Sequence, residues 1–144
     1  MSELRYYRDF SLIMMSRILE KEFGKEALDV LVDWRNRRIE EEWRKRGIEA
    51  KDKTPRYFLT LFSKEAHEFE VLEESEEALE VIVKKCIHAE IFKKFNASDV
   101  GEKMICSGDH YVVKGFNHGI ELVRDKLLMR GDECCHFLFK LKKQ

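Results

Sequence analysis

The second half of the chain holds sulfur, carboxylate and imidazole side chains at spacings that could support chemistry. Cys106 and Asp109 are three residues apart in a segment of helical periodicity, so they share one helix face, with His110 beside them. Cys86 and Cys135 lie in two other segments that alternate like strands. Thiols, carboxylates and imidazoles supply nucleophiles and general bases, and they are also donors that zinc prefers. These residues are the candidates for a catalytic or metal site.

The cysteines have several possible uses. A zinc site would combine the three thiols with one further donor, Asp109 or His110. With Asp109, which is preferred, the ligand set is Cys86, Cys106, Asp109 and Cys135. However, no two cysteines have the C-x-x-C spacing typical of zinc sites. Cys106 and His110, one helical turn apart, could instead form a nucleophilic pair. Free cysteines also serve as small apolar core residues or as part of a pocket wall, and the spacing leaves these alternatives open.

Asp109 needs a partner or solvent, because it lies in an otherwise apolar helical segment. Arg124 is the best partner in view. It interrupts the apolar alternation of a predicted strand, and a guanidinium there could clamp a carboxylate with two hydrogen bonds. The competing interpretation is that Asp109 forms an ordinary ion pair and Arg124 faces solvent.

Hydrophobic periodicity predicts the elements that position these residues. Helices are expected over residues 4–23, 25–46, 88–95 and 98–114, with Gly47 ending the second and a further helix starting at Thr54-Pro55. Strands are expected over residues 67–73, 79–83, 120–128 and 134–141. In the last strand Cys135 and Phe137 face the core, whereas Cys134 faces away. His88 is expected to be exposed at an element boundary.

This order of elements predicts a single α+β domain over residues 1–144. Its four-stranded antiparallel sheet consists of two hairpins, and the helices pack mainly on one face. The first two helices are expected to bury apolar side chains against each other or against a second subunit: Met14, Ile18, Leu28, Val30, Leu31 and Trp34. This pattern predicts a homodimer.

Composition excludes several classes of protein. The 27 basic and 28 acidic residues of the 144-residue chain give a net charge of −1, without the positive field of a nucleic-acid-binding protein. No apolar run is long enough to cross a membrane, and the charged N-terminus does not resemble a signal peptide. Four badly spaced cysteines indicate a reduced, cytoplasmic protein, and the 38% of charged residues is typical of a thermophile.

Four stretches between residues 81 and 139 resemble the L-2-amino-thiazoline-4-carboxylic acid hydrolase family: KKCIHAEIFKKF, MICSGDH, GFNHGIELVRDKLL and RGDECCHF. The matching features are Cys86 before a short helix, the C-x-x-D of Cys106 and Asp109, Arg124 in the penultimate strand, and the G-D-x-x-C-x-F that contains Cys135. The same layout is similar to the wider 4-vinyl-reductase-like domains and, distantly, to TRAPP vesicle-tethering subunits. At Leu127 the chain departs from the hydroxyl residue expected for the hydrolase family.

The resemblance implies a small-molecule hydrolase that opens a thiazoline ring. In that role Asp109 would be the general base for water, and Cys106 or Cys135 would attack directly or hold a zinc ion. Arg124 would bind the substrate carboxylate. The remaining substrate-binding residues would be Cys86, His110 and Phe137.

Two other classes compete with the enzyme. A sensor or binding module of the 4-vinyl-reductase-like type would hold a hydrophobic ligand in a mostly apolar pocket that includes Phe137. A structural or assembly subunit would instead present a large apolar surface to a second copy.

Overall fold

The computed structural model describes residues 3–143. The chain begins with two long helices, α1 (Glu3–Phe23) and α2 (Lys25–Glu49), followed by a 3₁₀ helix, Pro55–Leu61. A hairpin of β1 (His67–Glu74) and β2 (Ala78–Cys86) comes next. The remaining elements are, in order, α3 (Ile87–Lys94), α4 (Ser98–Gly101), a π-helical turn (Glu102–Cys106), α5 (Gly108–Phe116), β3 (Ile120–Lys126), a 3₁₀ turn (Leu128–Arg130) and β4 (Cys135–Leu141).

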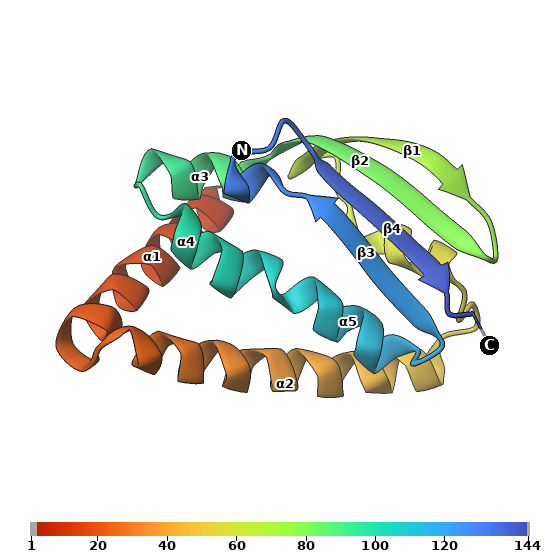
Figure 1. Cartoon of the computed structure of the whole chain (residues 1–144), viewed down its shortest axis with the longest axis horizontal. Coiled ribbons are helices and arrows are strands. Elements are labelled where there is room, and N and C mark those ends of the chain that lie inside the picture. Colours follow the sequence, from red (N-terminus) through yellow and green to blue (C-terminus); the bar gives the residue numbers. More distant parts are fainter. Residues whose placement is uncertain (1–2, 144) are drawn as a thin grey trace.

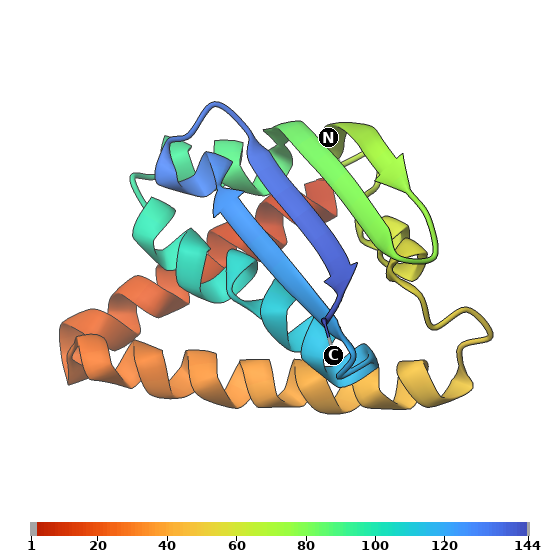
Figure 2. The ribbon, with the colours of Figure 1, turned by 45° about the vertical axis from the view of Figure 1, so that its right-hand side comes forward.

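The four strands form one antiparallel sheet in the order β1-β2-β4-β3. Two hairpins, β1–β2 and β3–β4, join through the pairing of β2 with β4. The helices lie mainly on one side of this sheet (Figures 1 and 2). The α+β fold predicted from the alternation and helical periodicity is therefore confirmed.

The inward face of the sheet is apolar because alternate residues of β2 and β4 point toward the helices. Val83 pairs with Cys135, and Val81 pairs with Phe137; all four are buried. Aromatic rings from the segment after α2 pack against this inward face of the sheet. The ring of Phe58 stacks on that of Phe139 with centroids 4.8 Å apart, and Phe62 meets Phe137 edge-on at 5.1 Å.

The single helix expected over residues 98–114 is wrong, because the segment is divided. The π-helical turn between α4 and α5 ends at Cys106, and the N–H of Ser107 bonds to the carbonyl of Glu102 at 2.9 Å. One extra residue in the turn changes the direction in which the residues after it point. Such turns occur frequently at functional sites. Here the turn sets the placement of Cys106 and Asp109.

Helix α5 packs closely on α2 through two glycines. A Cβ at Gly115 would collide with the backbone carbonyl of Glu40, and a Cβ at Gly47 would collide with that of Phe116. Gly47 was expected to end the second helix, but α2 continues to Glu49. At this position the glycine provides room for a neighbouring backbone and is not a C-cap.

Of the apolar side chains expected to be buried by α1 and α2, only Leu28 is buried within the single chain. Leu28 is buried, with 1% of its surface exposed, but Leu31 is 38% exposed and Trp34 is 64% exposed. The two helices diverge from the corner at Gly24 (Figure 1), so each touches its neighbours along a narrow stripe that includes Ile13 and Leu28. The remaining large apolar side chains, here named the α1–α2 apolar band, are exposed: Leu4, Tyr7, Met14, Met15, Ile18, Phe23, Val30, Leu31 and Trp34.

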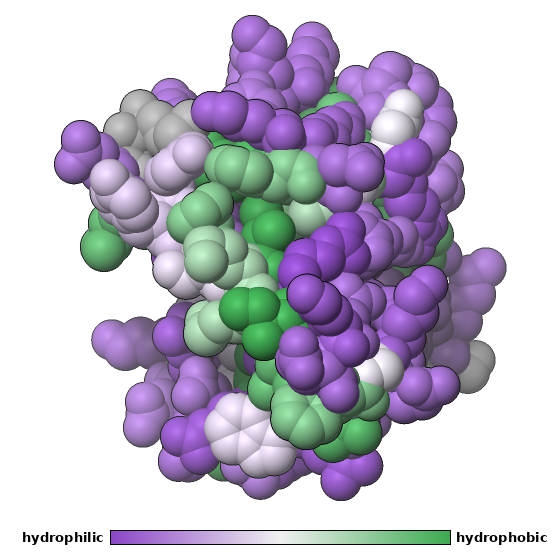
Figure 3. Space-filling model, turned by 90° about the vertical axis from the view of Figure 1, so that its left-hand side faces the viewer, coloured by the Kyte–Doolittle hydropathy of each residue, from purple (hydrophilic) through white to green (hydrophobic). Residues whose placement is uncertain are grey.

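Figure 3 shows hydrophobic surface running down the side of the molecule that carries α1 and the start of α2. Among residues 3–143, no helix is both long enough and apolar enough to cross a membrane.

Candidate functional site

A cavity of about 190 Å³ lies between the inward face of the sheet and the helices. It brings together four of the residues singled out from the sequence, from four different elements: Cys86, Cys106, Asp109 and Cys135. Phe137 also lines it. The rest of the wall is formed by Leu61, Phe62, His67, Val83, His88, Ile105 and Leu127. The cavity is therefore mostly apolar, with ionisable groups at a few points.

Asp109 is held by Arg124. Arg124 Nη1 donates to Asp109 Oδ2 over 2.7 Å and to the backbone carbonyl of Cys106 over 2.8 Å. The side chain of Arg124 is only 5% exposed, and that of Asp109 is 30% exposed. Burial raises the pKa of Asp109 to about 6, against the positive charges of Arg124 and Arg35, which lower it. The carboxylate can therefore exchange a proton near neutral pH.

The cavity thiols are protonated at neutral pH. Burial raises the pKa of Cys106, and the negative charge of Asp109 raises it further. Burial raises the pKa of Cys135 to about 11, although its sulfur accepts a hydrogen bond from the N–H of Leu128 at 3.2 Å. The pKa of Cys86 is also raised, chiefly by burial. Cys134 precedes β4 and is buried, but it does not line this cavity.

The sequence did not predict the pairing of His88 with Asp9 beside this cavity. His88 was taken to be exposed, which is wrong: its side chain is 14% exposed, and it lines the cavity. Its Nδ1 lies 2.5 Å from Oδ2 of Asp9, a fully buried carboxylate of α1. Arg8 donates to the other oxygen of Asp9 from Nε at 3.2 Å and from Nη2 at 2.9 Å.

A signal for this pair is present in α1. Asp9 precedes Ile13 by four residues, and it shares with Ile13 and Ser16 the buried stripe of the helix. An acid at such a position requires a buried partner. The sequence does not say which one, because His88 follows 79 positions later.

His67 is the second imidazole of this cavity. Burial lowers its pKa, and the neighbouring His88 lowers it further. Its Nδ1 accepts a hydrogen bond from the N–H of Ser63 at 3.3 Å. His67 is therefore neutral at neutral pH and has its Nε2 free of this bond.

The zinc set proposed from the sequence does not fit this arrangement. Within residues 3–143, no group of three or more His, Cys, Asp or Glu side chains is placed to hold a metal ion. The four side chains share a cavity without converging on one point.

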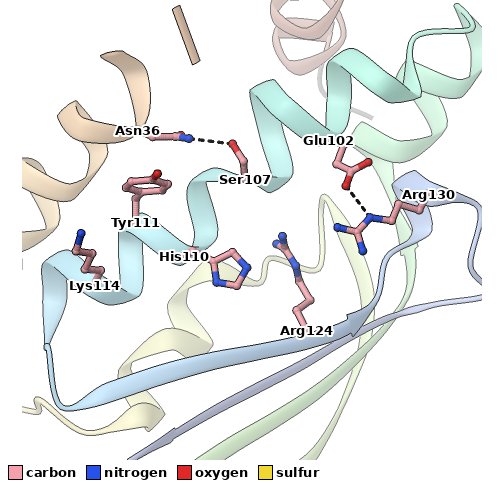
Figure 4. Close-up of a pocket in the computed structure, with 8 residues that line it drawn as sticks. All are labelled: Asn36, Glu102, Ser107, His110, Tyr111, Lys114, Arg124 and Arg130. Atoms are coloured by element: carbon pink, nitrogen blue, oxygen red, sulfur yellow. Dashed lines mark hydrogen bonds and ion pairs between the residues drawn. The ribbon is translucent and has the colours of Figure 1, made fainter. Parts of the chain in front are cut away.

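His110 is not part of this cavity. It lines a second one, of about 500 Å³, on the other side of Arg124 (Figure 4). The second cavity is polar, and its wall consists of Asn36, Glu102, Ser107, His110, Tyr111, Lys114, Arg124 and Arg130. Arg124 thus lies in the wall of the larger cavity while it binds a carboxylate of the smaller one.

Comparisons with known proteins bear on the family. No curated protein matches the chain. Among solved structures, the chain is similar to a trafficking protein particle complex subunit 3 from Naegleria fowleri covalently bound to palmitic acid, with 14% identity and a TM-score of 0.37. That match covers 90% of this chain and 96% of the other. A family model matches residues 5–139, which includes both cavities and nearly the whole fold. The chain belongs to the L-2-amino-thiazoline-4-carboxylic acid hydrolase family.

Proposed function

We propose that the protein is a hydrolase that opens a small cyclic amidine, such as a 2-amino-thiazoline ring, in the 190 Å³ cavity. The observation that carries this proposal is Asp109: a carboxylate with its pKa raised to about 6, fixed by Arg124, on the wall of a mostly apolar cavity. A general base works best when its pKa lies near the working pH. Membership of the hydrolase family supports the same reaction class.

The cavity suits a substrate of this size. 2-Amino-thiazoline-4-carboxylic acid has about nine non-hydrogen atoms, far fewer than the drug-sized ligands that fill roughly 300–1,000 Å³. The walls of Leu61, Phe62 and Leu127 would contact the ring faces, and Asp109 would meet the polar edge that carries the amidine nitrogens. Water is then confined to the space beside that edge.

In the first step, Asp109 takes a proton from water as the water oxygen bonds to the ring carbon between nitrogen and sulfur. It then gives this proton to the ring nitrogen. In the second step the bond between carbon and sulfur breaks, and its electron pair goes to sulfur while the new hydroxyl becomes a carbonyl. One water is consumed, and the product carries a ureido group and a free thiol.

His88 is the proposed acid for the second step. Its Nδ1 faces Asp9, and its Nε2, which lies 3.4 Å from Arg8 Nη2, is the nitrogen that would act on a molecule in the cavity. The ring accepts the proton that the hydroxyl loses and gives it to the departing sulfur, so it ends the step as it began. The buried Asp9 fixes the orientation of the ring, as the carboxylate does in other carboxylate–histidine pairs.

Arg124 and the cysteines have supporting roles in this proposal. The resemblance assigned Arg124 to the substrate carboxylate, but Arg124 does not line the 190 Å³ cavity and directs Nη1 to Asp109 and to the carbonyl of Cys106. We therefore assign it to positioning Asp109. Cys106 and Cys135 are protonated, so they serve as weak donors and as wall residues, not as nucleophiles.

The direct test is incubation of the purified protein with 2-amino-thiazoline-4-carboxylic acid, followed by mass spectrometry of the small molecules. Addition of one water, together with a new thiol that a maleimide captures, supports the proposal. Unchanged substrate over a range of pH from 5 to 9, with the protein folded by circular dichroism, contradicts it.

A second candidate function is the binding of a hydrophobic small molecule without turnover. The apolar half of the cavity wall favours it, since sensor pockets are mostly apolar: Leu61, Phe62, Val83, Ile105, Leu127 and Phe137. Tight binding of a hydrophobic probe such as a short-chain fatty acid, in a protein that leaves the thiazoline unchanged, would favour this function over hydrolysis.

A further inference from the structure

The second cavity has a positive wall. Three basic side chains, Arg124, Arg130 and Lys114, line it together with His110, and Glu102 is the one acid among its lining residues. The cations come from α5, β3 and the 3₁₀ turn before β4, so three elements direct charge toward one space. At about 500 Å³ the space is large enough for a small organic molecule.

Arg124 has hydrogen-bonding capacity to spare on this side. Both hydrogen bonds that its side chain makes to the described residues use Nη1. A guanidinium carries five N–H groups, so those of Nε and Nη2 remain for a ligand. The side chain is 5% exposed, which makes it a fixed donor and not a mobile surface group.

The pKa of His110 is lowered by burial and by the cations that lie near it. Burial lowers the pKa of His110, and the positive charges of Arg124 and Arg130 lower it further. Figure 4 shows the side chains of His110 and Arg124 next to each other along the same wall, with Arg130 beyond them. Arg130 donates from Nε to Glu102 at 2.6 Å, which fixes its guanidinium at this end of the cavity.

The other end of the cavity holds a buried acceptor without a donor. Asn36 is 3% exposed, and its Nδ2 donates to Ser107 Oγ over 3.0 Å. Its Oδ1 is buried and has no hydrogen-bond partner among the described residues. A buried amide oxygen left in this way is unfavourable until a donor reaches it.

We propose that the second cavity binds a small organic oxyanion, with its charged group on Arg124, Arg130 and His110 and a donor group on Asn36 Oδ1. The charged group is a carboxylate or a phosphate, since both accept from a guanidinium through two oxygens. The site is distinct from the cavity of the proposed ring opening. It shares one guanidinium with that cavity, so an occupant would act on Asp109 through Arg124.

Binding is measured on the full chain by titration with inorganic phosphate and, separately, with acetate, following the His110 ring signals by NMR. The thiazoline substrate is absent, so the outcome does not depend on the proposed hydrolysis. Tighter binding of phosphate identifies a phosphate ligand, and tighter binding of acetate identifies a carboxylate. No movement of the His110 signals by either anion at about 10 mM, a concentration that reveals even millimolar affinity, overturns the proposal.

Two variants and a control make the test specific. Arg130→Gln should weaken anion binding about tenfold, and Asn36→Asp should weaken it at least as much by placing a negative charge in the wall. Arg37→Gln is the matched control, because Arg37 is also paired with an acid, Asp33 at 3.0 Å, but lies outside the cavity. Equal weakening by the control, or unchanged binding by Arg130→Gln, overturns the site.

Discussion

Nδ1 of His88 lies 2.5 Å from Oδ2 of Asp9, although the two residues are 79 positions apart in the chain. The contact joins α1 to the start of α3 and places a buried carboxylate behind an imidazole of the small cavity. The first helix is thereby part of the candidate site, as well as part of the scaffold.

Replacement of His88 tests this role. His88→Gln should lower kcat for ring opening by about 10²–10⁴, the usual loss when a general acid is removed, and Asp9→Asn should lower it by less if Asn still accepts the hydrogen bond. The measurement is steady-state kinetics on folded variants, with the exposed His118→Gln as control. Full activity of His88→Gln would remove His88 from the mechanism.

The pH dependence of the reaction follows from Asp109. The folded protein has its pKa raised to about 6, above the ordinary value near 3.9, and the ionised form is the base. Activity should therefore rise as pH increases through about 6 and be lost below it. Arg124→Gln removes a positive charge that favours the carboxylate, so it should move this limb to higher pH. A pH–rate profile that is flat from pH 5 to 7 would contradict the assignment.

Packing of α2 can be tested with two leucines three residues apart. Leu28 is 1% exposed and belongs to the core, whereas Leu31 is 38% exposed. In the Trp34→Glu background, which the dimer prediction below makes monomeric, Leu28→Ala should lower the free energy of unfolding by about 2–5 kcal/mol, and Leu31→Ala by less than about 1 kcal/mol. Denaturant unfolding of both variants in this background gives the comparison. Equal losses would contradict this packing of α2.

The α1–α2 apolar band predicts self-association into a homodimer. Soluble monomers seldom expose a continuous apolar patch of many large side chains, and a second copy of the same surface would cover it. Sedimentation velocity should show a dimer for the wild type and a monomer for Trp34→Glu. A wild-type monomer at high protein concentration would remove this prediction.

The sheet could be predicted from the sequence because alternation in strands is a local signal. The inward side of β4 follows from Cys135, Phe137 and Phe139 alone, and the pairing of two hairpins follows from the order of elements. The family resemblance based on the cysteines, the C-x-x-D and Arg124 is likewise confirmed by the family match over residues 5–139.

The predictions are wrong where contacts between residues far apart in the sequence determine the local structure. A glycine often follows the end of a helix, which predicted that the second helix ends at Gly47. In the structure a glycine is required there because the backbone of Phe116 lies against it. The π-helical turn before Ser107 leaves no mark in hydrophobic periodicity. The pairing of Asp9 with His88 depends on the crossing of α1 and α3, which no local pattern contains.

The central claim is that Asp109 is the base of a ring-opening hydrolase, and one comparison of variants tests it most directly. Asp109→Asn keeps the shape of the side chain and removes the base, and Asp125→Asn makes the same change at a 60% exposed acid bonded to His136. Release of a new thiol from 2-amino-thiazoline-4-carboxylic acid, measured at pH 7.5 by mass spectrometry of the maleimide adduct, should fall at least about a hundredfold for Asp109→Asn and stay at the wild-type rate for Asp125→Asn. Equal rates for Asp109→Asn and the wild type would contradict the claim.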